Sequence, residues 1–227
     1  YIDNKFPYPV IIFDVGAHYG ETISIFTKNI KYERIYSFEA SPLNYNILKK
    51  KFLNEKSLNI KIYNFGLGDK ISDGYINQTA ESSSSTMNEL NKKSKYFIRK
   101  LKILKINNNK LYSKKIPVKI ITLDYFIKKY EIDKVDILKI DTEGFEFNIL
   151  KGLSKNFKKV KLIYFEHHYD DMILKNYTFS EINNLLIHYG FKMAKKNKML
   201  FRKSFEYIYE NQTNTKWILI NKIPLNS

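Results

Sequence analysis

Three short stretches place glycine or ionisable side chains directly after apolar runs that have the composition of buried strands. In the first, IIFDVGAHYGETISIF, Asp14 ends an apolar run, and Gly16 and Gly20 precede a helix-like pattern. A helix N-terminus carries unpaired N–H groups and partial positive charge, and small residues before it let a ligand approach the backbone. The stretch therefore predicts a ligand-binding turn. Its G-A-H-Y-G spacing differs from the dinucleotide fingerprint, and the sequence contains no Walker phosphate loop.

The other two stretches offer acids and a histidine for proton transfer. Asp141 and Glu143 follow the apolar run VDILKI, and Glu166 and His167 follow KLIYF. If these runs are neighbouring parallel strands, the four side chains lie at one edge of the sheet, where ligands bind in such folds. Asp141 is the first candidate for a general base. Glu143 can share that work, help to hold a divalent cation, or only favour a helix N-terminus.

His167 has two interpretations, because it can take up a proton near neutral pH or belong to a polar loop. Asp141, Glu166 and His167 together make a metal site conceivable, but no spacing among them is diagnostic of one. We therefore assign no metal.

Glu39, in the segment SFEA, is expected at the carboxyl end of the second strand. A carboxylate there lies beside the first turn and can accept both hydroxyl groups of a ribose, although in isolation it would be taken for an exposed loop acid. Asp14 can organise its turn or receive a ligand's ammonium group. A ligand with a ribose and an amino-acid zwitterion, but no pyrophosphate, is S-adenosylmethionine.

Strands that alternate with helices would position these residues. Strands are predicted at residues 10–15, 34–38, 60–65, 118–121, 135–140 and 161–165. Helices are predicted at residues 21–28, 123–130 and 179–189. Another is predicted from Pro42, with Ser41 as its N-cap, to about Leu53, and one follows DTEGFEF and ends at about Leu153. Residues 205–209 and 217–220 predict an antiparallel hairpin, and residues 74–115 an inserted, flexible or lid-like segment. The alternation predicts a parallel sheet in a single α/β domain over residues 1–227.

The composition agrees with one globular α/β domain of 227 residues, since 44% of them are hydrophobic. No apolar run approaches the roughly 20 residues needed to span a bilayer, and no signal peptide is visible. The absence of cysteine fits a reducing compartment, so we expect a cytoplasmic location. The net charge of +16 comes from lysines scattered along the chain, which favours a solvated surface over a nucleic-acid groove.

Taken together, these motifs resemble the FkbM family of methyltransferases. The segments DVGAHYGET, YSFEASPLNYNIL, FGLGD, VKIITLDYF and DILKIDTEGFEFNILKG follow the family's order from about Val10 to about Glu166. LKIDTEGFE is the most specific of them. The sequence departs from the family at His18, where Asn is usual, and at Thr142, where Val is usual.

The resemblance implies a Rossmann-like class I methyltransferase fold, with a mostly parallel seven-stranded sheet and an antiparallel C-terminal strand. It also implies methyl transfer from S-adenosylmethionine, typically to a hydroxyl group and often on a sugar. The cofactor-binding residues carried over by position are Asp14, Gly16, Ala17, His18, Gly20, Glu39, Ala40, Gly66, Leu67 and Gly68. The first turn would face the methionine end, the acid at 39 the ribose, and the glycines after the third strand the adenine.

The stretch ESSSSTM at 81–87 resembles a Ser/Thr-rich segment of the family, which can close over cofactor or acceptor or act as a polar linker. The leading hypothesis is an O-methyltransferase for a glycan or another small polyhydroxylated acceptor, with no nucleic-acid partner and no membrane span. One alternative is an RNA methyltransferase, which the positive charge favours and the absence of an N-P-P-Y-type motif opposes. The other is a non-catalytic interaction domain with the cofactor fold.

Overall fold

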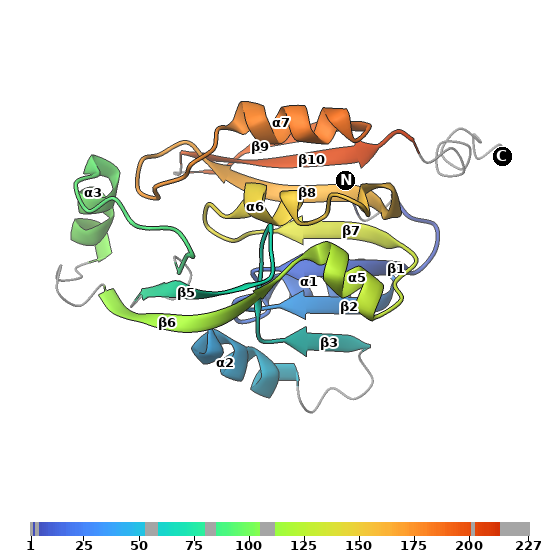
Figure 1. Cartoon of the computed structure of the whole chain (residues 1–227), viewed down its shortest axis with the longest axis horizontal. Coiled ribbons are helices and arrows are strands. Elements are labelled where there is room, and N and C mark those ends of the chain that lie inside the picture. The colour runs from blue at the N-terminus through green and yellow to red at the C-terminus, as the bar shows by residue number, and fades with distance from the viewer. Residues whose placement is uncertain are drawn as a thin grey trace.

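A computed structural model of the chain describes residues 2, 5–52, 59–79, 85–104, 112–200 and 203–213. Its centre is a seven-stranded sheet in the order β3-β2-β1-β7-β8-β10-β9 (Figure 1). The strands are β1 (Val10–Val15), β2 (Tyr32–Phe38), β3 (Ile60–Tyr63), β7 (Val135–Ile140), β8 (Val160–His168), β9 (Phe191–Lys198) and β10 (Ser204–Asn211). The first five in the sheet order pair in parallel, and β10 runs antiparallel to both neighbours. The predicted Rossmann-like α/β class is confirmed.

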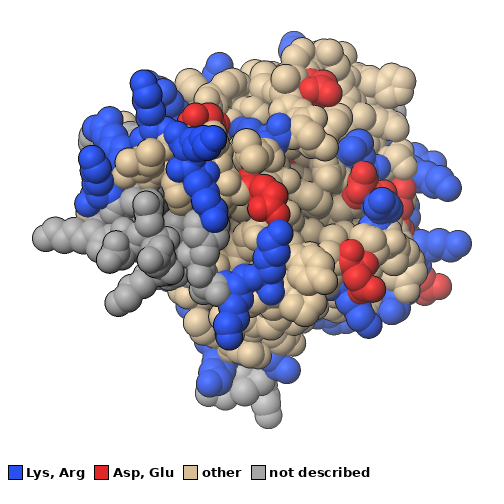
Figure 2. All heavy atoms as spheres, turned by 60° about the vertical axis from the view of Figure 1, so that its left-hand side comes forward, with Lys and Arg blue, Asp and Glu red and all other residues tan. Residues whose placement is uncertain are grey.

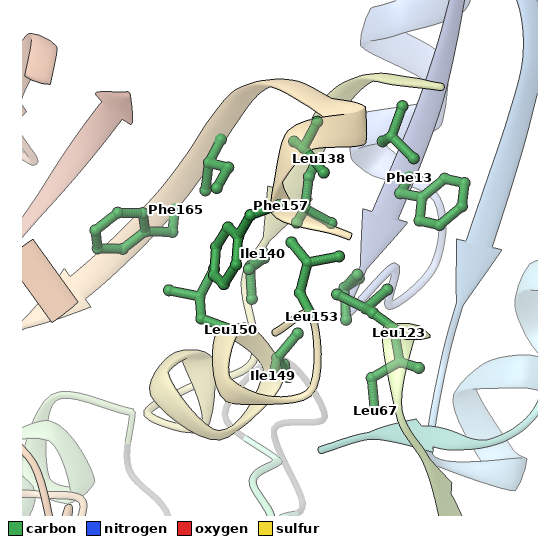
Figure 3. Close-up of a cluster of buried hydrophobic side chains, with 14 of the residues drawn as sticks. Phe13, Leu67, Leu123, Leu138, Ile140, Ile149, Leu150, Leu153, Phe157 and Phe165 are labelled. Atoms are coloured by element: carbon green, nitrogen blue, oxygen red, sulfur yellow. The ribbon is translucent and has the colours of Figure 1, made fainter. Parts of the chain in front are cut away.

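Helices cover both faces of the sheet. They are α1 (Glu21–Asn29), α2 (Pro42–Phe52), α5 (Leu123–Lys129), α6 (Glu146–Lys151) and α7 (Phe179–His188), with a 3₁₀ helix at Phe157–Lys159. Side chains of α5, α6 and α7 pack into one apolar cluster with the strands, and side chains of α1 and α2 pack into another. Figure 3 shows the first cluster, in which Phe13, Leu138 and Phe165 of the strands surround residues of the α6 region.

The position of β1 in the sheet marks where a ligand can bind. β1 lies between β2 and β7, so the strand order reverses direction along the chain at the β1–β7 boundary. Ligands bind at such a boundary, outside the carboxyl ends of the strands. Within the described residues, no helix has the length and apolar character needed to cross a membrane.

A second, three-stranded sheet contains β4 (Gly66–Leu67), β5 (Ser72–Thr79) and β6 (Tyr112–Ile121) in the order β4-β6-β5. The strand predicted at residues 60–65 is therefore too long: β3 ends at Tyr63, and Gly66 and Leu67 pair with β6 instead. The segment predicted as an insertion, 74–115, has strands at both ends and α3 (Lys95–Leu104) between them. Residues 80–84 and 105–111 lie outside the described residues.

The C-terminal hairpin differs in one partner from the sequence prediction. Residues 205–209 form part of β10, but the described strand that pairs with β10 at its outer edge is β9, while residues 217–220 lie outside the described residues. β9 has the sequence FKMAKKNK, and only Phe191 of it is buried. Exposed lysines are typical of an edge strand, and they remove the apolar alternation by which a strand is recognised in a sequence.

Candidate functional site

A cavity of about 260 Å³ opens at the carboxyl ends of β1, β2, β7 and β8. This volume is close to the lower end of the range of small-molecule sites, which starts at roughly 300 Å³. The predicted site residues on its wall are Gly16, Ala17, His18, Glu39, Ala40, Gly66, Leu67, Asp141, Glu143 and Glu166. The predicted residues that do not line it are Asp14, Gly20, Gly68 and His167.

The first turn is built around close backbone contacts. Gly16 has a φ of +81°, and a Cβ atom there would lie 1.8 Å from the carbonyl oxygen of Asp141. Its N–H and that of Ala17 donate to the carbonyl oxygen of Phe38, which ties the turn to the end of β2. Only glycine fits such a position. The turn therefore leaves the backbone of β1 in direct contact with the loop after β7.

His18 keeps the backbone conformation that this turn requires. Its φ is +50°, in the left-handed region, where His, Asn and Asp are enriched among non-glycine residues. Its N–H donates to Oε2 of Glu39 at 2.8 Å. The replacement of the family's usual Asn by His thus preserves the left-handed turn.

Glu39 links the first turn to the start of α2. Its carboxylate is 5% exposed and accepts from the N–H groups of His18 and Ser41, each at 2.8 Å. Burial raises the pKa of Glu39 to about 7, although the two backbone N–H groups oppose the shift. Each carboxylate oxygen can accept a further hydrogen bond, so the group can still receive ligand hydroxyls.

Gly20 and Gly68 support the site from behind its wall. A Cβ atom at Gly20, where φ is +80°, would lie 2.4 Å from Phe52 and 2.7 Å from Leu48, both on α2. A Cβ atom at Gly68 would lie 2.9 Å from Ile120 of β6. These two glycines let neighbouring elements approach each other, while other residues form the cavity surface.

A buried lysine joins the two predicted acids at the strand ends. Lys139 on β7 pairs in register with Asp14 on β1. Its Nζ lies 3.4 Å from Oδ1 of Asp14 and 3.4 Å from Oδ2 of Asp141. Burial alone would lower the pKa of Lys139, but the two carboxylates raise it above its usual value, so the side chain stays charged. Asp14 is fully buried, whereas Lys139 and Asp141 line the cavity.

Sequence reasoning missed Lys139, although a signal was present. A lysine inside the otherwise apolar run VDILKI, one residue before Asp141, must be paired if that run is buried. All six residues of β7 are buried. The spacing alone did not show that Asp14 on another strand would be the second partner.

The loop after β7 is held by a second residue that the sequence analysis did not select. Glu146, in the first turn of α6, is 1% exposed. It accepts from the N–H and Oγ1 of Thr142 at 3.3 and 3.1 Å and from the N–H of Gly144 at 3.0 Å. The hydroxyl of Tyr177 also donates to it, at 2.5 Å. Glu146 therefore acts as the helix N-terminal acid, and Glu143 lies on the cavity wall.

Strand β8 extends further than predicted, and this separates the two histidines. Glu166 and His167 were expected to follow the strand that ends at Phe165, but they and His168 belong to β8. Successive side chains of a strand point to opposite faces, so Glu166 and His168 share one face and His167 lies on the other. His167 packs near the rings of Tyr169 and Phe179, and burial lowers its pKa to about 3.

His168 faces the carboxylates of the site. Its Nε2 lies 3.4 Å from a carboxylate oxygen of Glu143 and of Glu166, and its Nδ1 lies 3.5 Å from Oδ2 of Asp170. Burial lowers the pKa of His168, but the hydrogen bond to Asp170 and the other carboxylates outweigh it and raise the pKa to about 9. The geometry thus favours His168, rather than His167, as the histidine associated with the cavity.

The segment after β5 also reaches the site. Thr86 donates from Oγ1 to the carbonyl oxygen of Glu143 at 2.7 Å, and Ser85, Thr86 and Met87 line the cavity. These residues end the ESSSSTM stretch, of which residues 81–84 lie outside the described residues. Within the described part of the chain, no three His, Asp or Glu side chains form a group that could hold a metal ion.

The sequence profile of the methyltransferase FkbM domain matches residues 14–193. The chain belongs to the FkbM methyltransferase family. No curated protein matches it. The methyl donor of the family is S-adenosylmethionine, as the sequence analysis expected.

Solved structures place this FkbM chain among methyltransferase folds. It is similar to the FkbM methyltransferase of Methylobacillus flagellatus KT, with 16% identity and a TM-score of 0.52 over 88% of this chain. The chain spans 44% of that protein's length. It is also similar to an rRNA methylase of Streptococcus thermophilus, with 8% identity and a TM-score of 0.51, over 92% of this chain and 91% of that one. At these identities, the likeness shows the fold alone.

The residues of this FkbM chain fit the family's donor. Phe65, Leu67 and Met87 give the cavity an apolar wall of the kind that receives a purine ring, and Glu39 offers carboxylate oxygens suited to a ribose. The turn at Gly16, where a side chain would have no room, exposes backbone to the cavity. The cavity thus offers an apolar wall to a flat aromatic base and carboxylate oxygens to a diol.

Proposed function

We propose that this FkbM domain transfers a methyl group from S-adenosylmethionine to a hydroxyl group of a sugar, glycan or another small polyhydroxylated acceptor. The observation that carries the proposal is the position of Asp141. Its side chain is 38% exposed on the cavity wall, while Lys139 holds its Oδ2 at 3.4 Å. An acid held in this way is suited to orient an acceptor hydroxyl and to receive its proton.

The protein's own contribution would be alignment and proton removal. When bound, the donor supplies a methyl group that is already activated on a sulfonium. Lys139 fixes the orientation of the Asp141 carboxylate, and Glu146 fixes the loop that carries it. Holding the partners in line converts a bimolecular step into an effectively unimolecular one, which accounts for a large share of the rate enhancement in such reactions.

The charges on the cavity wall support a hydroxyl-rich acceptor. Asp141, Glu143 and Glu166 all line the cavity. Carboxylates accept hydrogen bonds from hydroxyl groups and repel phosphates. This arrangement favours a polyol over the phosphate backbone of a nucleic acid inside the cavity.

RNA remains the second candidate acceptor, because the chain carries a net charge of +16. The two hypotheses differ in their dependence on salt. Transfer to RNA should weaken steeply between 50 and 200 mM salt, by orders of magnitude where several phosphates are contacted, whereas transfer to a neutral glycan should hardly change.

The test has two stages. Titration calorimetry with S-adenosylmethionine should detect binding, and Glu39→Ala should weaken it by about 1.5–3 kcal/mol because the ribose hydroxyls lose a charged partner. Absence of binding to folded protein would leave only the non-catalytic alternative. Radiolabelled methyl transfer onto extracted glycans, lipids and RNA in parallel should then label the glycan fraction.

In the same assay Asp141→Asn should retain donor binding and lose turnover. Full activity of Asp141→Asn would refute the assignment of Asp141. A label found only in RNA would refute the assignment of the acceptor, while leaving the donor site intact.

A further inference from the structure

The outer face of α3 carries a row of cations. Lys95, Arg99 and Lys102 are all exposed, and their spacing of four and three residues places them on one face of the helix. Two isoleucines flank the row, Ile98 at 41% exposure and Ile103 at 69%. Large aliphatic side chains beside three cations form a surface that is both basic and apolar.

The inner face of the same helix is anchored, so the row points away from the protein. Phe97 is buried against Leu90, Met172 and Ile173. At the start of the helix, the hydroxyl of Ser94 donates to Asp171 at 2.5 Å. These contacts attach α3 to the loop after β8 and fix which side faces outward.

The helix also lies on the same side of the molecule as the cavity. Figure 1 shows α3 beyond the carboxyl ends of β7 and β8, the end of the sheet at which the cavity opens. Only a few residues separate Thr86 and Met87 on the cavity wall from the anchored Leu90. In Figure 2, which turns this side forward, Lys and Arg gather at the upper left of the surface.

The segment of the sequence that contains α3 is strongly basic. Residues 72–121, which run from β5 through α3 to β6, contain eleven Lys and Arg and three Asp and Glu, a net charge of +8. This segment thus carries half of the chain's net charge of +16. This stretch of the sequence is thus more basic than the rest of the chain.

We propose that the outer face of α3 docks on an anionic lipid surface and brings the cavity to an acceptor presented there. Lysine and arginine are attracted to anionic headgroups, and aliphatic side chains insert at the headgroup boundary. A single-stranded nucleic acid would instead be expected to meet aromatic side chains on which bases stack, whereas the exposed apolar side chains of this face are isoleucines. The role of the lipid in presenting the acceptor rests on the proposed function, but the docking itself does not.

Sedimentation with vesicles tests the docking directly. The protein should bind vesicles containing anionic phosphatidylglycerol, should not bind pure phosphatidylcholine vesicles, and should dissociate as salt increases. Each cation near such a surface contributes about fivefold in affinity, so replacing Lys95, Arg99 and Lys102 by Gln should weaken binding by roughly a hundredfold. Equal binding by the parent and this variant would overturn the proposal.

A matched control removes three cations elsewhere. Lys128, Lys129 and Lys158 are exposed on the connections that enter β7 and β8, at the amino ends of the strands. Replacing these three by Gln should change vesicle affinity by less than about threefold if α3 is the docking site. A loss as large as that of the α3 variant would show that only total charge matters, and would overturn the proposal.

The isoleucines distinguish a lipid surface from a nucleic acid. Ile98→Ser with Ile103→Ser should weaken vesicle binding and leave the binding of an RNA oligonucleotide unchanged. If RNA binds more tightly than vesicles and the isoleucines do not matter, the face binds nucleic acid and the lipid proposal is wrong. Calorimetry with S-adenosylmethionine on the same variants keeps the two proposals separate, because none of the substituted α3 residues lines the cavity.

Discussion

Replacing Lys139 by Met tests the link between the two strand-end acids. Met has a similar length and no charge, so the variant leaves the buried Asp14 without its cation and Asp141 without its support. Removing one partner of a buried ion pair typically costs about 3–5 kcal/mol. Because Lys139 is almost wholly buried, we expect a loss of stability at the upper part of that range.

Denaturant unfolding and a pH–rate profile measure the two consequences. Lys139→Met should lower the free energy of unfolding by about 3–5 kcal/mol, and the double variant Lys139→Met/Asp14→Asn should recover part of it, because the pair is coupled. Lys139→Arg, which keeps the charge, should retain more activity than Lys139→Met. In Lys139→Met, the acidic limb of the pH–rate profile should also move to higher pH, because carboxylates without a nearby cation hold their protons more strongly.

A second buried pair in the same sheet supplies the control. Lys161 lies 2.6 Å from the fully buried Asp136, at the opposite end of the strands from the cavity. Lys161→Met should destabilise the fold by less, because Asp136 keeps Lys134 at 3.4 Å, and should leave the pH–rate profile unchanged. If both variants shift the profile equally, or if Lys139→Met changes neither stability nor turnover, the assigned role of Lys139 is refuted.

Three further outcomes follow from the structure. Because the ionised form of Glu39 is the better acceptor and its pKa is raised to about 7, donor affinity should increase as pH rises from 6 to 8 in calorimetry, and Glu39→Gln should abolish this dependence. The pKa of His168 is raised to about 9, so its protonation contributes at most about 3 kcal/mol to the free energy of unfolding. This contribution is complete below about pH 6.5 and is lost as pH rises through 9, and unfolding curves of His168→Gln should lack this loss. Gly16→Ala, whose Cβ would meet the carbonyl oxygen of Asp141 at 1.8 Å, should lower both stability and donor affinity, and normal affinity would contradict the account of the turn.

The sequence predicted correctly those strands in which a run of consecutive apolar residues indicates burial. β1 and β7 read as VIIFDV and VDILKI, and both are almost wholly buried in the structure. β9 gave no such signal, because an edge strand needs hydrogen-bonding partners but few buried side chains. The break between β3 and β4 was also hidden, since nothing in IKIYNFGLG shows that the chain changes sheets at Asn64.

The site residues likewise fall into those that the local sequence predicts and those that it does not. Acids at the ends of strands, such as Asp141, were predictable because the position of a strand end follows from the apolar run before it. Lys139 and Glu146 were not selected, because their importance depends on contacts with other segments. His168 could be selected only once the end of β8 was known. The strand extends three residues beyond the predicted end, and the alternation of its side chains then places His168 and Glu166 on one face.

The close approach of Gly16 to the backbone of Asp141 couples the donor turn to the proposed base. Gly16 belongs to the turn assigned to the donor and Asp141 to the position assigned to the base, and there is no space between them for a side chain. The N–H of Asp141 also donates to the carbonyl oxygen of Val15, at 2.9 Å. A displacement of the turn must therefore displace the backbone that carries the acid. Substitutions in the turn should consequently change turnover together with donor affinity, whereas removing only the Asp141 carboxylate should change turnover alone.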